Sequence, residues 1–127
     1  MTILIVGGAC QGKREYAQKA FGLNEREILP WNEEREAASC IADLHLRVRA
    51  CLEKGLTQQE VLEKLLPFCR GKIVLCDDIF CGVVPLGALE RQWREVTGRL
   101  LCRLAQEADS VIRMQCGLPQ AIKGELP

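Results

Sequence analysis

The chain has 127 residues, with 17 basic and 17 acidic side chains and so no formal net charge. This length predicts one compact domain spanning residues 1–127. A composition of 48% hydrophobic and 27% charged residues is typical of a soluble globular protein and excludes disordered and fibrous classes. Balanced charge provides no field to concentrate nucleic acid or an anionic membrane, so we expect neither as a partner.

The apolar runs of the sequence are short. The longest, at residues 3–6 and 73–76, have the length of a strand and fall well below the ~18 residues that a membrane helix needs. The amino terminus lacks the basic region of a signal peptide and passes directly into glycines. We therefore expect a cytoplasmic protein without membrane insertion, whose eight cysteines are free thiols.

The chain opens with a predicted strand, a glycine loop and a predicted helix. Residues 2–6 form a continuous apolar run, typical of a strand buried on both faces of a parallel sheet, and Gly7 and Gly8 end it. A helix is predicted over residues 13–21. This order of elements is one α/β unit.

The middle of the chain predicts a short strand and two helices. The strand, over residues 26–29, stops at a proline. Apolar residues at helical intervals predict a long helix over residues 33–54, which ends at a glycine. The capping box Thr57–Glu60 opens a further helix that extends to about residue 66.

The carboxyl-terminal half repeats the alternation. Residues 72–77 predict a second buried strand that ends in acidic side chains, and a loop with glycine and proline follows at 81–85. A long helix over 86–108, a strand over 110–115 and a last extended piece at 120–123 complete the chain. Alternating strands and helices predict a parallel sheet with right-handed crossovers, which binds ligands at the carboxyl ends of its strands.

The glycine loop has the spacing of a phosphate-binding loop. It reads Gly-Gly-Ala-Cys-Gln-Gly-Lys over residues 7–13, directly after a strand and before a helix. Such a loop surrounds phosphates with backbone N–H groups and a helix N-terminus, and its lysine reaches the terminal phosphates. A glycine turn with a surface lysine is the plain alternative, but the flanking elements favour the loop. The predicted nucleotide-binding residues are Gly7, Gly8, Ala9, Cys10, Gln11, Gly12, Lys13 and Arg14.

This motif predicts an α/β fold of the P-loop NTPase type, a three-layer sandwich around a small, mostly parallel sheet, with ATP or GTP as ligand. One position departs from the motif. A hydroxyl is expected after the lysine because it ligates Mg²⁺, and Arg14 cannot do so. Asp77 and Asp78, at the end of a strand, are placed to hold a metal or simply to cap the next turn. The metal site is left open, and we expect nucleotide affinity to depend little on Mg²⁺.

His45 is the only histidine in the chain. Its helical neighbours Ile41 and Val48 are apolar, so it borders a buried stripe, where a structural role is common. The functional alternative is a nucleophile that takes a phosphoryl or nucleotidyl group. Arg47 and Arg49 are placed to attract phosphate or to form a solvated face.

Several further segments match one known pattern together with the opening residues 3–13. They are Gly82-Val83-Val84-Pro85, Arg94-Glu95-Val96-Thr97-Gly98-Arg99, Leu104-Ala105 with Ala108-Asp109, Gly117-Leu118-Pro119, and Lys123. In this order and at nearly this spacing, they resemble the bifunctional adenosylcobinamide kinase / adenosylcobinamide-phosphate guanylyltransferase family of cobalamin assembly. The resemblance covers about half of the chain.

The resemblance implies ATP or GTP as donor, a corrinoid side-chain alcohol as acceptor and a symmetric oligomer. It also implies a histidine that carries GMP covalently, on a helix after the second strand. His45 with Arg49 four residues later reproduces the family's pair, and Asp78 stands where the family has a glutamate. The family carries serine at the position of Arg14.

One block of the family pattern has no counterpart between His45 and Lys72. It is a strand that ends in an aspartate-cysteine-leucine-threonine type segment, followed by a helix. Without that acid, we expect magnesium-dependent kinase chemistry to be weak or absent. Two interpretations stay open: a short transferase of the family, which is the leading one, and a nucleotide- or corrinoid-binding protein without turnover.

Overall fold

The computed structural model describes residues 1–9, 11–35, 37–79 and 87–127. The elements in chain order are β1 (Ile3–Gly7), α1 (Lys13–Phe21), the 3-10 turn η1 (Glu25–Glu27), β2 (Ile28–Leu29), β3 (Cys40–Ile41), α2 (Leu44–Glu53), α3 (Gln58–Cys69), β4 (Ile73–Asp77), α4 (Ala88–Glu107), β5 (Ser110–Gln115) and β6 (Leu118–Lys123). Cys10, the loop predicted at 81–85 and the predicted helix start at residue 86 lie outside the described residues.

The strands form one sheet in the order β2-β3-β4-β1-β5-β6. All neighbouring pairs are parallel except β5 and β6, which are antiparallel. Because β1 lies between β4 and β5, the loop that follows β1 leaves the sheet at the middle of its carboxyl edge.

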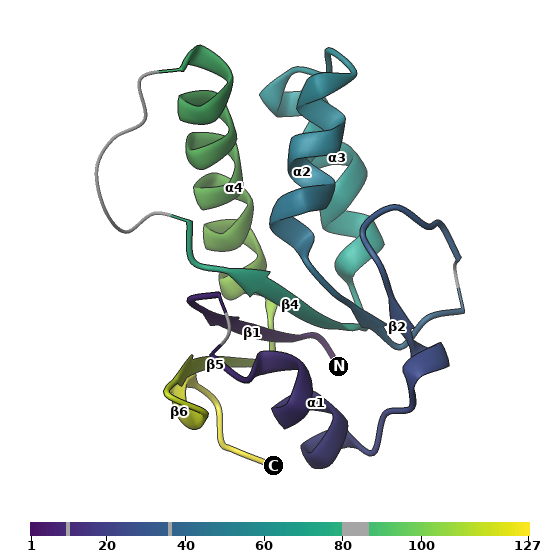
Figure 1. The fold of residues 1–127 in the computed structure, drawn as a ribbon, viewed down its shortest axis with the longest axis vertical. Coiled ribbons are helices and arrows are strands. Elements are labelled where there is room, and N and C mark those ends of the chain that lie inside the picture. Colours follow the sequence, from purple (N-terminus) through teal and green to yellow (C-terminus); the bar gives the residue numbers. More distant parts are fainter. Residues whose placement is uncertain (10, 36, 80–86) are drawn as a thin grey trace.

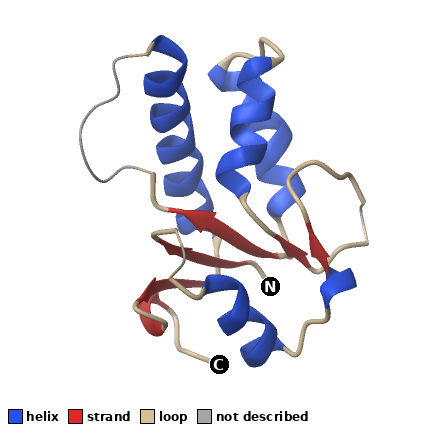
Figure 2. Ribbon diagram, in the orientation of Figure 1, coloured by secondary structure: helices blue, strands red, loops and turns tan. Residues whose placement is uncertain are grey.

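Helices cover both faces of this sheet (Figures 1 and 2). α2, α3 and α4 pack on one face and α1 packs on the other, so the molecule has three layers. This arrangement confirms the predicted α/β class with a mostly parallel sheet. No helix in the described ranges is long and apolar enough to cross a membrane.

The apolar run of β1 is explained by these two covers. Leu4 belongs to the core beneath α2, α3 and α4, whereas Ile3 and Ile5 belong to the core beneath α1. Successive side chains of a strand point to opposite faces, so a strand covered on both sides is apolar at every position. Burial of such side chains stabilises the fold by roughly 1.5–3 kcal/mol each.

The helix predicted over 33–54 is wrong in its first half. The segment instead contains β3, which pairs with β2 and β4, and α2 begins only at Leu44. Asp43 separates the two elements with a left-handed backbone (φ 52°). The buried side chain of Arg47 donates to the carbonyl oxygens of Pro30 and Glu33, and so provides hydrogen bonds for two backbone groups of the loop before β3. Arg47 is therefore not part of a solvated face.

Smaller corrections concern the ends of other elements. α3 passes through Pro67 and ends at Cys69, where the sequence predicted an end near residue 66. A proline near the end of a helix breaks few backbone bonds, and the burial of Cys69 favours the extra turn. The last strand begins at Leu118 rather than at residue 120, because the two residues after β5 form a tight hairpin turn with positive φ.

Candidate functional site

A cavity of about 690 Å³ lies at the middle of the carboxyl edge. Four segments that are distant in sequence line it: the phosphate-binding loop with the start of α1, the β3–α2 connection, the end of β4 and the β5–β6 turn. This is the edge where the sequence places a ligand.

Two glycines allow the loop to approach its neighbours closely. A Cβ atom at Gly7 would lie 2.6 Å from the carbonyl oxygen of Met114, so no larger residue fits between β1 and β5 there. Gly12 has a φ of 85°, and a Cβ on it would lie 3.3 Å from the Cα of Gly117. These positions need glycine for space and for backbone conformation.

The loop is also fastened to the β5–β6 turn. The side-chain oxygen of Gln11 accepts a hydrogen bond from the Cys116 amide, 2.5 Å away, and its main-chain oxygen accepts one from Gly117 at 3.2 Å. Sequence reasoning missed Cys116 and Gly117 as part of the site. The available signal was the hairpin turn that these two residues form after β5. The sequence could not show that β5 pairs with β1.

Lys13 lies at the centre of the site and is nearly buried, with 8% of its surface exposed. Its Nζ donates to the carbonyl oxygens of Gly7, at 3.2 Å, and of Gly8, at 2.7 Å. It also forms a salt bridge with Asp77 Oδ1 at 2.7 Å. The ammonium group therefore lies where the loop would hold phosphate oxygens, and protein oxygens satisfy it there.

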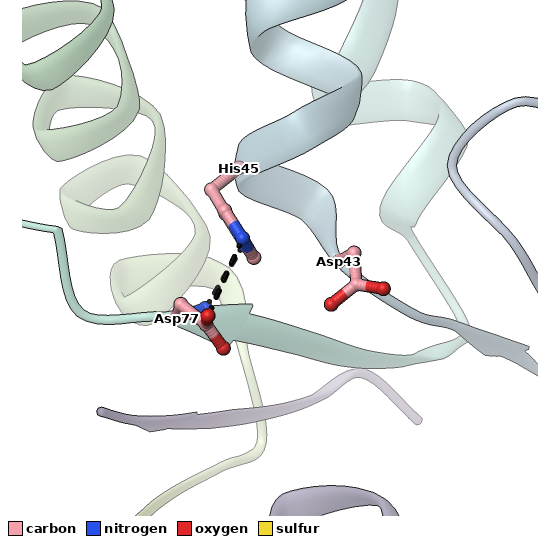
Figure 3. Close-up of side chains that lie close together, drawn as sticks. All are labelled: Asp43, His45 and Asp77. Atoms are coloured by element: carbon pink, nitrogen blue, oxygen red, sulfur yellow. Dashed lines mark hydrogen bonds and ion pairs between the residues drawn. The ribbon is translucent and has the colours of Figure 1, made fainter. Parts of the chain in front are cut away.

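Asp77, at the end of β4, also contacts His45 (Figure 3). The Asp77 amide donates to His45 Nδ1 at 3.1 Å, and His45 Nε2 lies 3.5 Å from Asp77 Oδ2. Burial lowers the pKa of His45, whereas the carboxylates of Asp77 and Asp43 raise it. The structure thus brings together Lys13, Asp77 and His45, which the sequence had singled out separately.

Asp43 is a further acidic residue of the site, and sequence reasoning missed it. Oxygen or nitrogen ligand atoms of Asp43, His45 and Asp77 all lie within 4.8 Å of one another. Asp43 follows β3 and precedes α2, so a strand followed by an acid and a helix is present just before His45. Residues 45–72 contain only α2 and α3, so the block expected to be missing there has no counterpart in that stretch. An acid-bearing strand is nevertheless present before His45, where the sequence predicted a long helix instead.

The family implies the Mg²⁺ that accompanies a nucleotide, and the donor atoms permit a test of its fit. Mg²⁺ prefers oxygen ligands, which Asp43 and Asp77 supply at the cavity wall. His45 does not fit, since its Nδ1 already accepts the Asp77 amide. The two carboxylates are thus the groups that would hold the ion in place of the missing hydroxyl.

Arg14 follows Lys13 but lies at the rim of the cavity. Its guanidinium forms a salt bridge with Glu25 at 2.7 Å, and 48% of its side chain is exposed. Hydrogen bonds from Arg14 and Gln18 lower the pKa of Glu25. The Arg14 charge is therefore shared with Glu25 of the η1 turn.

Asp78 and Arg49, like Gly7, Gly8 and His45, are not among the described residues that line the cavity. Asp78 donates its amide to the Gly7 carbonyl oxygen at 2.7 Å, and its carboxylate lies 3.6 Å from Arg113. Arg49 pairs with Glu53 and Glu90 and lies over the Trp93 ring. Arg49 thereby connects α2 to α4 instead of reaching the phosphate loop.

Comparison with known proteins adds the family. No curated protein matches the sequence. The family model of cobinamide kinase / cobinamide phosphate guanyltransferase matches residues 33–122, which is well over half of the chain. The match begins after the phosphate-binding loop, so loop and family are separate indications of nucleotide chemistry. The chain belongs to the cobinamide kinase / cobinamide phosphate guanyltransferase family, as its carboxyl-terminal segments predicted.

Proposed function

We propose that the chain binds a nucleoside triphosphate at the phosphate-binding loop and transfers its terminal phosphoryl group to a corrinoid side-chain alcohol. The observation that carries this proposal is Lys13, a nearly buried ammonium group at the wall of a cavity of about 690 Å³. Membership of the family supports the nucleotide as donor and the corrinoid as acceptor.

The phosphates would replace the protein oxygens that now satisfy Lys13. Its Nζ donates to two loop carbonyls and to Asp77, and a triphosphate offers stronger, charged acceptors for the same hydrogens. The N-terminus of α1 adds partial positive charge at this point. Binding therefore exchanges internal bonds of the loop for bonds to the ligand.

The transfer step needs an acceptor oxygen in line with the leaving group. The corrinoid hydroxyl forms a bond to the terminal phosphorus as the bond to the bridging oxygen breaks, and the nucleoside diphosphate leaves with that electron pair. The hydroxyl proton is released to solvent as the new bond forms. Mg²⁺ held by Asp43 and Asp77 would neutralise phosphate charge during this step.

We further infer that residues 1–127 act as one domain, because both cores share one sheet. The family resemblance predicts a symmetric oligomer. The sequence predicts a cytoplasmic location.

A second candidate is nucleotide binding without turnover. Arg14 favours it, because the hydroxyl that normally ligates Mg²⁺ is replaced by a guanidinium paired with Glu25. A charged group at the rim strengthens binding of an anion without supplying a metal ligand.

The test is a calorimetric titration with ATP and with GTP, in the presence and absence of Mg²⁺, on three proteins. They are wild type, Lys13→Ala and the matched control Lys19→Ala, which removes an exposed lysine from the same helix. We expect binding to be weakened in Lys13→Ala alone. Equal affinities in all three proteins would overturn the proposal.

Turnover then separates the two candidates. Wild type is incubated with nucleotide and cobinamide, and the phosphorylated corrinoid is followed by mass spectrometry. A product that requires Lys13 supports the transferase. Tight nucleotide binding without product supports the second candidate.

A further inference from the structure

Both ring nitrogens of His45 face groups of the protein. Nδ1 lies 3.1 Å from the Asp77 amide nitrogen, and Nε2 lies 3.5 Å from the Asp77 carboxylate. Figure 3 shows the ring directed at the end of β4. One residue, Asp77, thus contacts the imidazole at both positions.

The contact with the amide determines the tautomer. A backbone N–H can only donate, so Nδ1 must be the nitrogen with the lone pair. A ring whose Nδ1 holds a lone pair cannot be an imidazolium, so it is neutral and carries its proton on Nε2. The lone pair of Nδ1 therefore accepts the Asp77 amide, and Nε2 carries a hydrogen instead of a lone pair.

This arrangement leaves no nitrogen available for attack. A histidine nucleophile needs an unprotonated nitrogen that faces the phosphorus atom. The side chain of His45 is only 7% exposed, and the described residues that line the cavity include Asp77 and Asp43 but not His45. The ring also lies near Trp93, whose Nε1 donates to the His45 carbonyl oxygen at 2.6 Å.

The position of His45 in the fold agrees with its geometry. The family resemblance implies a guanylyl-carrying histidine on a helix after the second strand. α2, which carries His45, follows the third strand, β3. His45 also lies two residues after Asp43, next to the acid-bearing strand.

We propose that His45 is a positioning residue that fixes Asp77 through a neutral Nε2–H tautomer, and that this chain forms no guanylylated histidine. The ring accepts from the Asp77 main chain, its Nε2 lies 3.5 Å from Oδ2, and Oδ1 pairs with Lys13. Because the chain has a single histidine, no other imidazole can take the group. The assignment extends the proposed function, since Asp77 and Lys13 act at its nucleotide site.

The first test reads the tautomer directly and does not depend on nucleotide binding. Nitrogen NMR of uniformly ¹⁵N-labelled wild type at pH 7.5 needs no assignment, because one histidine gives one pair of ring resonances. We expect a pyridine-like Nδ1 and a pyrrole-like Nε2. A protonated Nδ1, in a neutral ring or an imidazolium, would overturn the proposal even if the nucleotide site is real.

The second test uses two substitutions of similar size. His45→Asn places an oxygen acceptor where Nδ1 lies, whereas His45→Leu removes it. We expect the asparagine variant to keep the Mg²⁺-nucleotide affinity within about threefold and the leucine variant to lose about tenfold, because the Asp77 amide is left without a partner. Equal loss in both variants would show that the accepting atom is not what matters and would overturn the proposal.

The third test concerns covalent chemistry. Wild type is incubated with GTP labelled in the α-phosphate, with Mg²⁺ or Mn²⁺, and examined for a label that survives base and is released by acid. We expect none. A label of this kind that disappears in His45→Asn would identify His45 as the nucleophile and overturn the assignment. Failure of the Lys13→Ala titration would instead count against the proposed function.

Discussion

Lys13 and Arg14 are neighbours in sequence but belong to two different regions of the molecule. Lys13 is 8% exposed and bonds to two carbonyl oxygens and Asp77. Arg14 is at the rim, where half of its side chain is exposed and its partner Glu25 is more exposed still. Two consecutive residues thus lie one in the buried centre of the site and the other at its exposed rim.

The difference teaches how far each charge can act. Exposed ion pairs contribute about 0–1 kcal/mol, because water screens them and long side chains lose freedom on pairing. A buried ammonium group depends on its partners, since water cannot replace them. The centre should therefore respond strongly to substitution and to ligand, and the rim only weakly.

The largest contrast is expected for the thiols of buried and exposed cysteines. Burial raises the pKa of Cys40 and of Cys69 to about 12, whereas Cys102 and Cys116 are exposed. Because the thiolate is the reactive form, Cys40 and Cys69 should react with a disulfide reagent at pH 8 at least ~10³-fold more slowly than the exposed pair. The measurement is absorbance of the released thiol, in a background with Cys10→Ser and Cys81→Ser.

The same assay extends to the nucleotide. Cys116 lines the cavity and Cys102 does not, so ATP or GTP should slow Cys116 alone. Urea should expose every thiol at once, which serves as the control. Rapid reaction of Cys40 in the folded protein would contradict the burial of its thiol.

The next effect concerns the two neighbouring cations. Lys13→Ala should weaken nucleotide binding by about 1.5–3 kcal/mol, because a charge-assisted contact is lost. Arg14→Ala should change it by less than about 1 kcal/mol, because its charge is exposed and shared with Glu25. Calorimetry at one ionic strength gives both values. A larger loss of binding in Arg14→Ala than in Lys13→Ala would contradict the expectation that the buried cation matters more than the exposed one.

A smaller effect is expected at Asp43. Asp43→Asn keeps the size of the side chain but removes a charge from the cavity wall, so the small gain in nucleotide affinity that Mg²⁺ gives the wild type should be lost. Affinity without metal should stay equal or rise, because one negative charge beside the phosphates is gone. An unchanged Mg²⁺ effect would show that Asp43 does not hold the ion. Asp109→Asn, an exposed acid at the opposite edge of the sheet, is the matched control.

The smallest effect belongs to the rim itself. Arg14→Ser supplies the hydroxyl that the motif expects, so nucleotide binding should become a few-fold more dependent on Mg²⁺. The free energy of unfolding should change by no more than about 1 kcal/mol, because only an exposed ion pair is removed. Thermal unfolding with and without Mg²⁺ measures both quantities. Wild-type binding that occurs only with Mg²⁺ would contradict the prediction for Arg14.

The sequence alone determined the centre of the fold and half of the site. The apolar runs at residues 2–6 and 72–77 predicted β1 and β4, and the helix over 13–21 has the predicted limits. The spacing of Gly7, Gly12 and Lys13 predicted the loop between β1 and α1. These features depend on neighbours within a few residues, so a local pattern is enough to predict them.

Only the tertiary structure decided which distant residues meet. β3 has two residues and forms because β4 is there to pair with it, so no periodicity predicts it, whereas the strand predicted over 26–29 is shortened to the two residues of β2. Asp43 entered the site, and Arg49 and Asp78 did not line the cavity, through the same arrangement. The physical reason is that strand pairing and side-chain contacts of this kind join residues far apart in the chain, and a single sequence records their chemistry but not their distance.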